Sequence, residues 1–307
     1  MRILLVVNTS ASAVTARARV VIAKALSADH TVTVTETSRR GHATRLAQGA
    51  AADGLDAVVV LGGDGTLNEA ANGLAESTTA LGVLPGGSTN VFARTIGMTN
   101  DPIEATGELL GAMARDSRLR IGLGSVNGRY FLFHAGAGYD AAVVKEVERR
   151  GALKRYVSDP LFVWAAVTTW FRHYDRGRPR FSVTLGRPGE NETPVDATFA
   201  VVQNSDPYTF LGNRPLTLSH SAGLDSPLTA VVFRRLRAAT LLRALGAALG
   251  SSGRLPASRG VVQRAGLTEL TITGIGPFPY QLDGDYLGEA ESLSIRYEPA
   301  CLDLYVP

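Results

Sequence analysis

The run Val58–Glu69, VVVLGGDGTLNE, constrains the fold of this chain more than any other stretch. Its first four residues are apolar and mostly β-branched, which predicts a buried strand of a parallel sheet. The strand ends at residues 62–65, GGDG, where missing Cβ atoms allow a ligand to approach the backbone. A helix follows, with Thr66 predicted as its N-cap. A strand, a glycine turn and a helix N-terminus together direct backbone N–H groups at one point, which suits a phosphate.

Asp64 adds a carboxylate beside this point. A carboxylate next to phosphates is typical of Mg²⁺ binding or of proton transfer. We expect Asp64 on an exposed turn, so that replacing it would leave the fold intact. A tight structural turn is the alternative for a bare pair of glycines, but the longer run GGDGTLNE favours nucleotide-phosphate binding.

Two blocks of the sequence resemble the catalytic domain of the diacylglycerol kinase family, which bacterial lipid kinases and sphingosine kinases share. The first is GGDGT with its continuation through Asn68, Glu69 and Asn72–Leu74. The second is Leu84–Arg94, LPGGSTNVFAR. NAD kinases and phosphofructokinases share the GGDGT turn but not this continuation. Weaker similarities extend the resemblance over nearly the whole chain.

The resemblance implies ATP and Mg²⁺ as cofactors, with Asp64 as the metal ligand. Asn8 follows the first strand, where the family has an asparagine motif. Thr37 stands where the family places a nucleotide-contacting threonine, although a plain helix-entry residue is an equal alternative. The implied nucleotide-binding residues are Asn8, Thr37, Gly62, Gly63, Asp64, Gly65, Thr66, Asn68, Glu69, Gly86, Gly87, Ser88, Thr89 and Asn90.

Near the C-terminus, the run Leu282–Asp285, LDGD, resembles the Asp-Gly-Glu motif of the family. The last acid of that motif accepts a proton from the substrate, and Asp285 occupies its place. Asp283 lies two residues earlier, and alternate residues of a strand point to the same side, so both acids are candidate catalytic residues. The sequence leaves open which one is the base. An Asp-Gly hairpin turn is the structural alternative.

Alternating strands and helices to residue 118 predict an α/β domain with a doubly wound parallel sheet, similar to NAD kinases and diacylglycerol kinases. Ligands of such sheets bind at the carboxyl ends of the strands. Residues 119–298 predict a β-rich, antiparallel, sandwich-like lipid-substrate domain. It starts with an Asn-Gly hairpin in Val126–Phe131 and includes strands at Leu267–Thr273 and Ser292–Tyr297. Residues 299–307 form a last strand, Leu302–Val306, which returns to the first domain.

Three features of the sequence depart from the family pattern. Val91 and Gly122 stand where many members have aspartate. In the loop Ala222–Leu228, Ser226 and Pro227 replace an Asp-Gly pair that holds a structural Mg²⁺ in the family. We therefore predict no tightly bound Mg²⁺ at Asp225.

Composition limits the partners and the location. A net charge of +3 over 307 residues suits anionic nucleotides or lipid surfaces and is too weak to argue for nucleic acid. The single cysteine, Cys301, excludes an internal disulfide and fits a reducing cytoplasm.

The apolar run Leu161–Phe171 is either a buried helix or a wall for an acyl chain. The arginines 234, 235, 237 and 243 form either a solvated face or a surface for anionic membrane.

The sequence therefore predicts an ATP- and Mg²⁺-dependent lipid kinase of phospholipid metabolism, with diacylglycerol or a related lipid alcohol as substrate. It is expected in the cytoplasm, peripheral at the inner membrane surface and in transient contact with it. A homodimer is left open. The alternatives are a sphingoid-type lipid kinase and a catalytically impaired nucleotide-binding regulatory protein.

Overall fold

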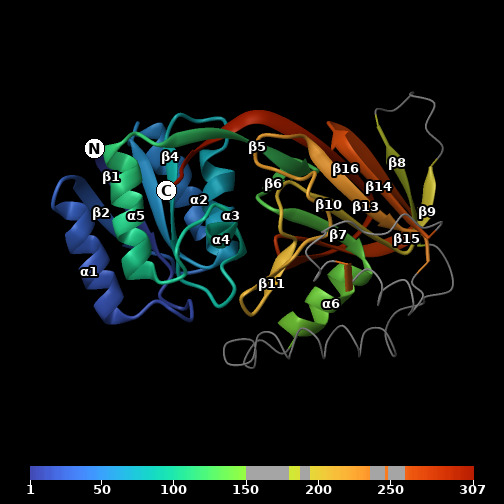
Figure 1. Cartoon of the computed structure of the whole chain (residues 1–307), viewed down its shortest axis with the longest axis horizontal. Helices are drawn as coiled ribbons and strands as arrows, with labels where there is room; N and C mark the ends of the chain where they lie inside the picture. The colour runs from blue at the N-terminus through green and yellow to red at the C-terminus, as the bar shows by residue number, and fades with distance from the viewer. Residues whose placement is uncertain (150–179, 187–193, 236–245, 248–259) are drawn as a thin grey trace. The chain divides into compact units, whose positions relative to one another are not determined.

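The computed structural model of the chain describes residues 1–149, 180–186, 194–235, 246–247 and 260–307 (Figure 1). The chain forms two compact units. Unit 1 contains Met1–Leu123 and Pro299–Pro307, and unit 2 contains Gly124–Glu298. The boundary falls a few residues after the predicted one at residue 118.

Unit 1 is built on a parallel sheet. Its strands are β1 (Arg2–Val7), β2 (Thr31–Glu36), β3 (Ala57–Gly62) and β4 (Ala80–Pro85), in the order β2-β1-β3-β4. All six residues of β3 are buried, as the apolar run predicted. The last part of β16 (Asp285–Tyr305) joins this sheet beside β4, where Leu304 pairs in parallel with Leu81.

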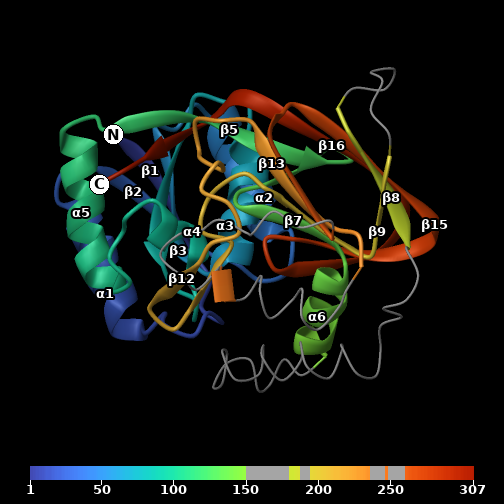
Figure 2. The same cartoon turned by 45° about the vertical axis from the view of Figure 1, so that its right-hand side comes forward.

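Helices cover both faces of this sheet, which confirms the doubly wound arrangement. Helices α1 and α5 lie side by side over one face, and α2 and α3 pack together over the other (Figures 1 and 2). The helices of unit 1 are α1 (Ala16–Ser27), α2 (His42–Ala52), α3 (Asp64–Leu74), α4 (Val91–Thr95) and α5 (Pro102–Ala114).

Unit 2 is an antiparallel, β-rich unit with one described helix of some length, α6 (Tyr139–Glu148). The main strand order is β14-β13-β10-β7-β15-β16. Its strands are β7 (His134–Gly138), β10 (Phe199–Gln203), β13 (Leu228–Phe233), β14 (Val261–Leu267) and β15 (Glu269–Leu282). The shorter strands are β6 (Arg129–Phe131), β8 (Phe181–Leu185), β9 (Val195–Ala197), β11 (Thr209–Leu211) and β12 (Arg214–Leu216), and β5 (Arg118–Val126) enters from unit 1.

Two of the predicted strands have different bounds in the structure. The predicted strand Leu267–Thr273 is the end of β14 and the start of β15, which are separated at Thr268. The predicted last strand, Leu302–Val306, is the final part of β16, which runs without interruption from Asp285. The Asn-Gly hairpin was predicted correctly. Asn127 and Gly128 have φ angles of 49° and 83°, as a two-residue turn between β5 and β6 requires.

The sheet of unit 2 buries apolar side chains on both faces. One face contributes Phe131, Val183, Val202 and Leu293 to a large core. On the other face, Val201 and Val231 pack with Val143 and Val147 of α6. Among the described residues, no helix is both long enough and apolar enough to cross a membrane.

Candidate functional site

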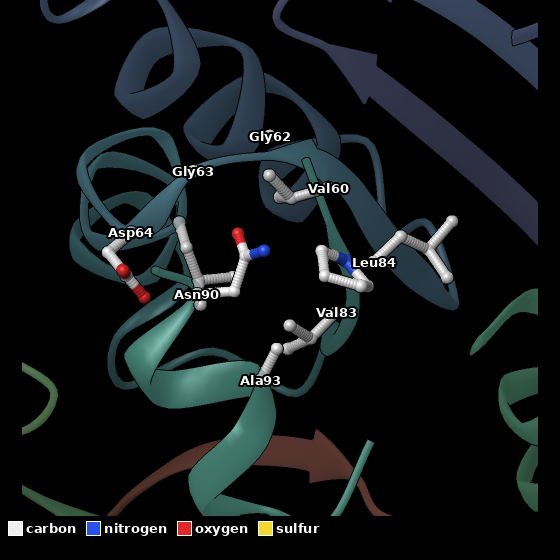
Figure 3. A pocket seen from close by; sticks show the side chains of 10 residues that line it. Val60, Gly62, Gly63, Asp64, Val83, Leu84, Asn90 and Ala93 are labelled. Atoms are coloured by element: carbon white, nitrogen blue, oxygen red, sulfur yellow. The ribbon is translucent and has the colours of Figure 1, made fainter. Parts of the chain in front are cut away.

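The two glycine turns of unit 1 lie against each other at the carboxyl ends of β3 and β4. The N–H of Gly86 donates to the carbonyl oxygen of Gly62 across 2.8 Å. A Cβ atom on Gly86 would lie 2.8 Å from the Cα of Gly62, and one on Gly87 would lie 2.9 Å from the Cα of Gly63. These distances are too short for a Cβ atom, so glycine is required at positions 86 and 87. A small pocket lies beside the turns, lined in part by Gly62, Gly63, Asp64 and Asn90 (Figure 3).

Asp64 does not lie on an exposed turn, and Thr66 is not the helix cap. Helix α3 begins at Asp64 itself, with Gly63 as its N-cap. Because Gly63 has no side chain, the first turn of α3 presents its backbone N–H groups without a capping side chain. Anions bind favourably to helix N-termini of this kind.

The carboxylate of Asp64 caps another helix. Its two oxygens accept hydrogen bonds from the N–H groups of Val91 and Phe92, at 3.0 and 3.1 Å. The first N–H groups of a helix have no partner within the helix, and a carboxylate stabilises them. Asp64 is half-buried as a result and holds α4 against α3.

Asn8 and Thr37 lie at the same edge of the sheet. The side-chain amide of Asn8 donates to the Thr66 hydroxyl across 2.8 Å, and the N–H of Asn8 donates to Leu61. The N–H of Thr37 donates to the carbonyl oxygen of Val7 across 2.9 Å. The fold therefore gathers the ends of β1, β2, β3 and β4 around the two glycine turns.

Asn68 and Glu69 make hydrogen bonds with other parts of unit 1. Asn68 is 2% exposed, and its carbonyl oxygen accepts a hydrogen bond from the side-chain amide of Asn72. The carboxylate of Glu69 accepts hydrogen bonds from the N–H groups of Gly41 and Ala43, at the start of α2. The Glu69 carboxylate thus links α3 to the start of α2, whereas the contact between Asn68 and Asn72 lies within α3.

The side chain of Asn90 stabilises the second glycine turn by hydrogen bonds to its backbone. Its φ angle is 49°, and it is 3% exposed. Its amide oxygen accepts from the N–H of Gly87, and its amide nitrogen donates to Gly87 and Asn100. Ser88 is exposed and Thr89 is half-buried, so these two residues present the accessible groups of the turn.

The donor set fits a Mg²⁺ ion shared with phosphates. Mg²⁺ in phosphate-transfer sites is bound by one or two carboxylates together with substrate oxygens. Asp64 contributes its carboxylate beside the pocket at the glycine turns. Within the described parts of the chain, no group of three or more His, Cys, Asp or Glu residues could hold a metal ion by itself.

In unit 2, Asp283 and Gly284 form a two-residue turn between β15 and β16, with φ angles of 49° and 78°. The Asp283 carboxylate is 5% exposed and accepts three hydrogen bonds, from the N–H groups of Leu132, Phe133 and His134. The hairpin alternative is therefore present in the structure. Asp285 follows the turn as the first residue of β16 and is half-buried.

A buried polar group beside this turn was missed by the sequence reasoning. Asp140, in the first turn of α6, accepts hydrogen bonds from the hydroxyl of Tyr208 and from the amide nitrogen of Gln281. Burial raises the pKa of Asp140, and the two hydrogen bonds oppose that rise. The glycine-rich run before Asp140 was the available signal, but Tyr208 and Gln281 stand in no recognisable motif.

Two predictions lie partly or wholly outside the described residues. The apolar run Leu161–Phe171 is among them, as are Arg237 and Arg243. Arg234 and Arg235 are exposed after β13.

In the loop with Asp225, the N–H and the hydroxyl of Ser226 both donate to the carbonyl oxygen of Gly223. The absence of a tightly bound Mg²⁺ there stays a prediction.

Comparisons with known proteins give consistent results. Residues 2–121 match the family model described as the diacylglycerol kinase catalytic domain. The chain is 42% identical over 105 residues to a diacylglycerol kinase of Bacillus subtilis, which covers 33% of each chain. It is 31% identical over 182 residues to the protein named "Probable lipid kinase YegS-like" of Chromohalobacter salexigens, which covers 58% of this chain and 55% of that one. These matches span about a third to a half of the relatives' lengths.

A crystal structure of a diacylglycerol kinase from Bacillus anthracis has the same fold. The TM-score is 0.72 at 18% identity, and the alignment covers 100% of this chain and 97% of the other. At this identity the similarity describes the fold alone.

Proposed function

Because the chain belongs, through residues 2–121, to the diacylglycerol kinase catalytic domain family, we propose that it is an ATP- and Mg²⁺-dependent lipid kinase. Its substrate in this proposal is the hydroxyl group of diacylglycerol or a related lipid alcohol. The observation that carries the proposal is the contact between the glycine turns at Gly62–Gly63 and Gly86–Gly87. Because the glycines carry no Cβ atoms, phosphates could approach the backbone of both turns there.

Phosphoryl transfer requires the protein mainly to position and neutralise phosphate groups. We assign the nucleotide phosphates to the first turn of α3, residues 63–66, and to the accessible groups of Ser88 and Thr89. Asp64 would hold the metal ion, which would offset the negative charge of the phosphates. Asn8, Asn68, Glu69 and Asn90 support this site through the contacts that keep the turns and helices in place.

The acceptor hydroxyl also needs a base. We assign that role to Asp285, because the carboxylate of Asp283 already binds three backbone N–H groups. Those hydrogen bonds direct the Asp283 carboxylate at the backbone of residues 132–134 rather than toward a substrate. The lipid substrate places the enzyme, in this proposal, at the cytoplasmic surface of a membrane.

The test is incubation of the purified protein with radiolabelled ATP, Mg²⁺ and vesicles that contain a total lipid extract. Labelled phosphatidic acid supports the proposal. A labelled sphingoid base supports the sphingoid-type alternative instead. ATP binding without any labelled lipid would contradict kinase activity and favour a nucleotide-binding regulatory protein. The Asp285→Asn variant, run in parallel, controls for a contaminating kinase.

A further inference from the structure

The turn that precedes Asp285 is held on both sides by side chains, of which Gln281 is buried and Glu148 half-buried. The N–H of Gly284 donates to the amide oxygen of Gln281 across 2.8 Å. On the other side, the N–H of Tyr286 donates to the carboxylate of Glu148, on α6, across 3.0 Å. The backbone amides that flank Asp285 are therefore both fixed, and this fixes the direction in which its side chain leaves the strand.

The orientation of Gln281 is set in turn by Asp140. The amide nitrogen of Gln281 donates to one oxygen of Asp140 across 2.6 Å, and the hydroxyl of Tyr208 donates to the other oxygen. Gln281, Asp140 and Tyr208 are 0%, 4% and 9% exposed. Rotation of the Gln281 amide by half a turn would place its oxygen against the Asp140 carboxylate and its nitrogen against the N–H of Gly284. Both contacts would be repulsive, so Asp140 keeps the Gln281 oxygen directed at the turn.

The hydrogen bond between Asp140 and Gln281 requires a glycine on the neighbouring strand, β7. Gly136 on β7 pairs with Gln281 on β15. A Cβ atom on Gly136 would lie 1.8 Å from an oxygen of Asp140 and 2.6 Å from the amide nitrogen of Gln281. Real Cβ atoms do not approach other atoms so closely. The glycine at 136 is therefore a condition for the Asp140–Gln281 pair.

We propose that Gln281 and Asp140 are positioning residues that hold the turn of Asp283 and Gly284 so that Asp285 meets the acceptor hydroxyl. This rests on the proposed function, in which Asp285 is the base. Proton transfer requires the base within hydrogen-bond distance of the hydroxyl. A misplacement of about 1 Å can lower turnover by about 10²-fold. Loss of the Gln281 contact should therefore lower kcat and leave the KM for ATP unchanged, because both residues belong to unit 2 and the glycine turns assigned to ATP belong to unit 1.

The experiment is a double-mutant cycle with Gln281→Met and Asp285→Asn, measured as kcat for lipid phosphorylation. Methionine keeps the length of the side chain and removes both hydrogen bonds. We expect a loss of kcat of about 10- to 100-fold in Gln281→Met. In the Asp285→Asn background the same change should cause no further loss, because the positioned base is already gone. An equal loss in both backgrounds would show a general structural role and overturn the proposal.

The matched control is Gln203→Met. Gln203 lies on the same face of the same sheet, in β10, is 0% exposed, and donates to the carbonyl oxygen of Ser205 rather than to the turn. The kcat of the Gln203→Met variant, per folded molecule, should equal that of the wild type. Should Gln281→Met fail to fold, the cycle is repeated with Tyr208→Phe, which removes one hydrogen bond to Asp140 and should give a smaller loss that again disappears with Asp285→Asn.

Different outcomes would overturn the proposed function and the positioning role. A wild-type protein that labels no lipid overturns the proposed function, and the positioning role with it. An active wild type with unchanged kcat in folded Gln281→Met overturns the positioning role alone.

Discussion

The carboxylate of Asp64 accepts a hydrogen bond from the backbone N–H of Val91 across 3.0 Å, although the two residues are 27 positions apart. Its second oxygen binds the N–H of Phe92. The acid that the sequence assigns to the metal is thus also the acid that caps α4. Its removal should affect both the site and the fold.

We expect Asp64→Asn to abolish lipid phosphorylation and to lower the free energy of unfolding by about 1–3 kcal/mol. Asparagine places an amide nitrogen where an oxygen now accepts a backbone N–H. The control is Glu108→Gln, because the half-buried Glu108 accepts from the N–H of Thr99 in the same unit, away from the glycine turns. Urea unfolding and turnover are measured for both variants. Normal turnover in folded Asp64→Asn would refute the metal assignment.

Replacing each of the two acids of the LDGD run should have a different effect on the protein. Asp285→Asn should lower turnover on the order of 10²–10⁴-fold, the usual contribution of a general base, with ATP affinity unchanged. Asp283→Asn should mainly lower stability, because three backbone N–H groups lose part of their acceptor. Asp285→Glu should retain measurable activity. The assignment is reversed if Asp283→Asn, tested as folded protein, loses more turnover than Asp285→Asn.

Gly73 should tolerate no side chain. A Cβ atom at this position of α3 would lie 2.4 Å from the carbonyl oxygen of Thr44 and 2.7 Å from the Cβ of Ala47, both on α2. Gly73→Ala should therefore destabilise the protein by about 1–3 kcal/mol or more. The matched variant is Gly49→Ala on α2, where a Cβ would meet none of the described atoms within 4 Å. That variant should gain about 0.5–1 kcal/mol in urea unfolding, since alanine favours the helix.

His134 should make the protein less stable in mild acid. Burial lowers its pKa to about 3, from an ordinary value of 6.5. Above pH 6.5 the ring is neutral in both states. Below it, the unfolded chain takes up a proton that the folded protein refuses, so stability falls as the pH drops from 6.5 toward 3.

Between pH 7 and pH 5, we expect the wild type to lose about 2 kcal/mol more than His134→Met. Urea-unfolding curves at both pH values measure this difference. Asp140 and Tyr208, which lie nearby, are present in both proteins, so their contributions cancel. Parallel stability curves for the two proteins would show that His134 is not held neutral.

Local sequence patterns predicted a structural feature correctly where the physical cause of that feature is local. The apolar run of β3 predicted its own burial, because four β-branched or aliphatic residues in sequence fit only a strand covered on both faces. Asn127 and Gly128 predicted their hairpin, since both tolerate a positive φ. The glycine pairs predicted the phosphate-facing turns, although their mutual contact became visible only in the fold.

The roles of the buried carboxylates were decided by tertiary structure alone. Asp283 binds N–H groups about 150 positions away, and Asp140 binds Gln281, which is 141 positions away. A carboxylate accepts from whichever backbone N–H groups the fold leaves unpaired beside it, and no pattern around Asp64, Asp140 or Asp283 states which those are. The sequence by itself determined the buried strand β3, the Asn-Gly hairpin, the glycine turns and the resemblance to a family. The packing of distant segments determined which acids hold the structure together, because that choice depends on partners that only the folded chain brings close.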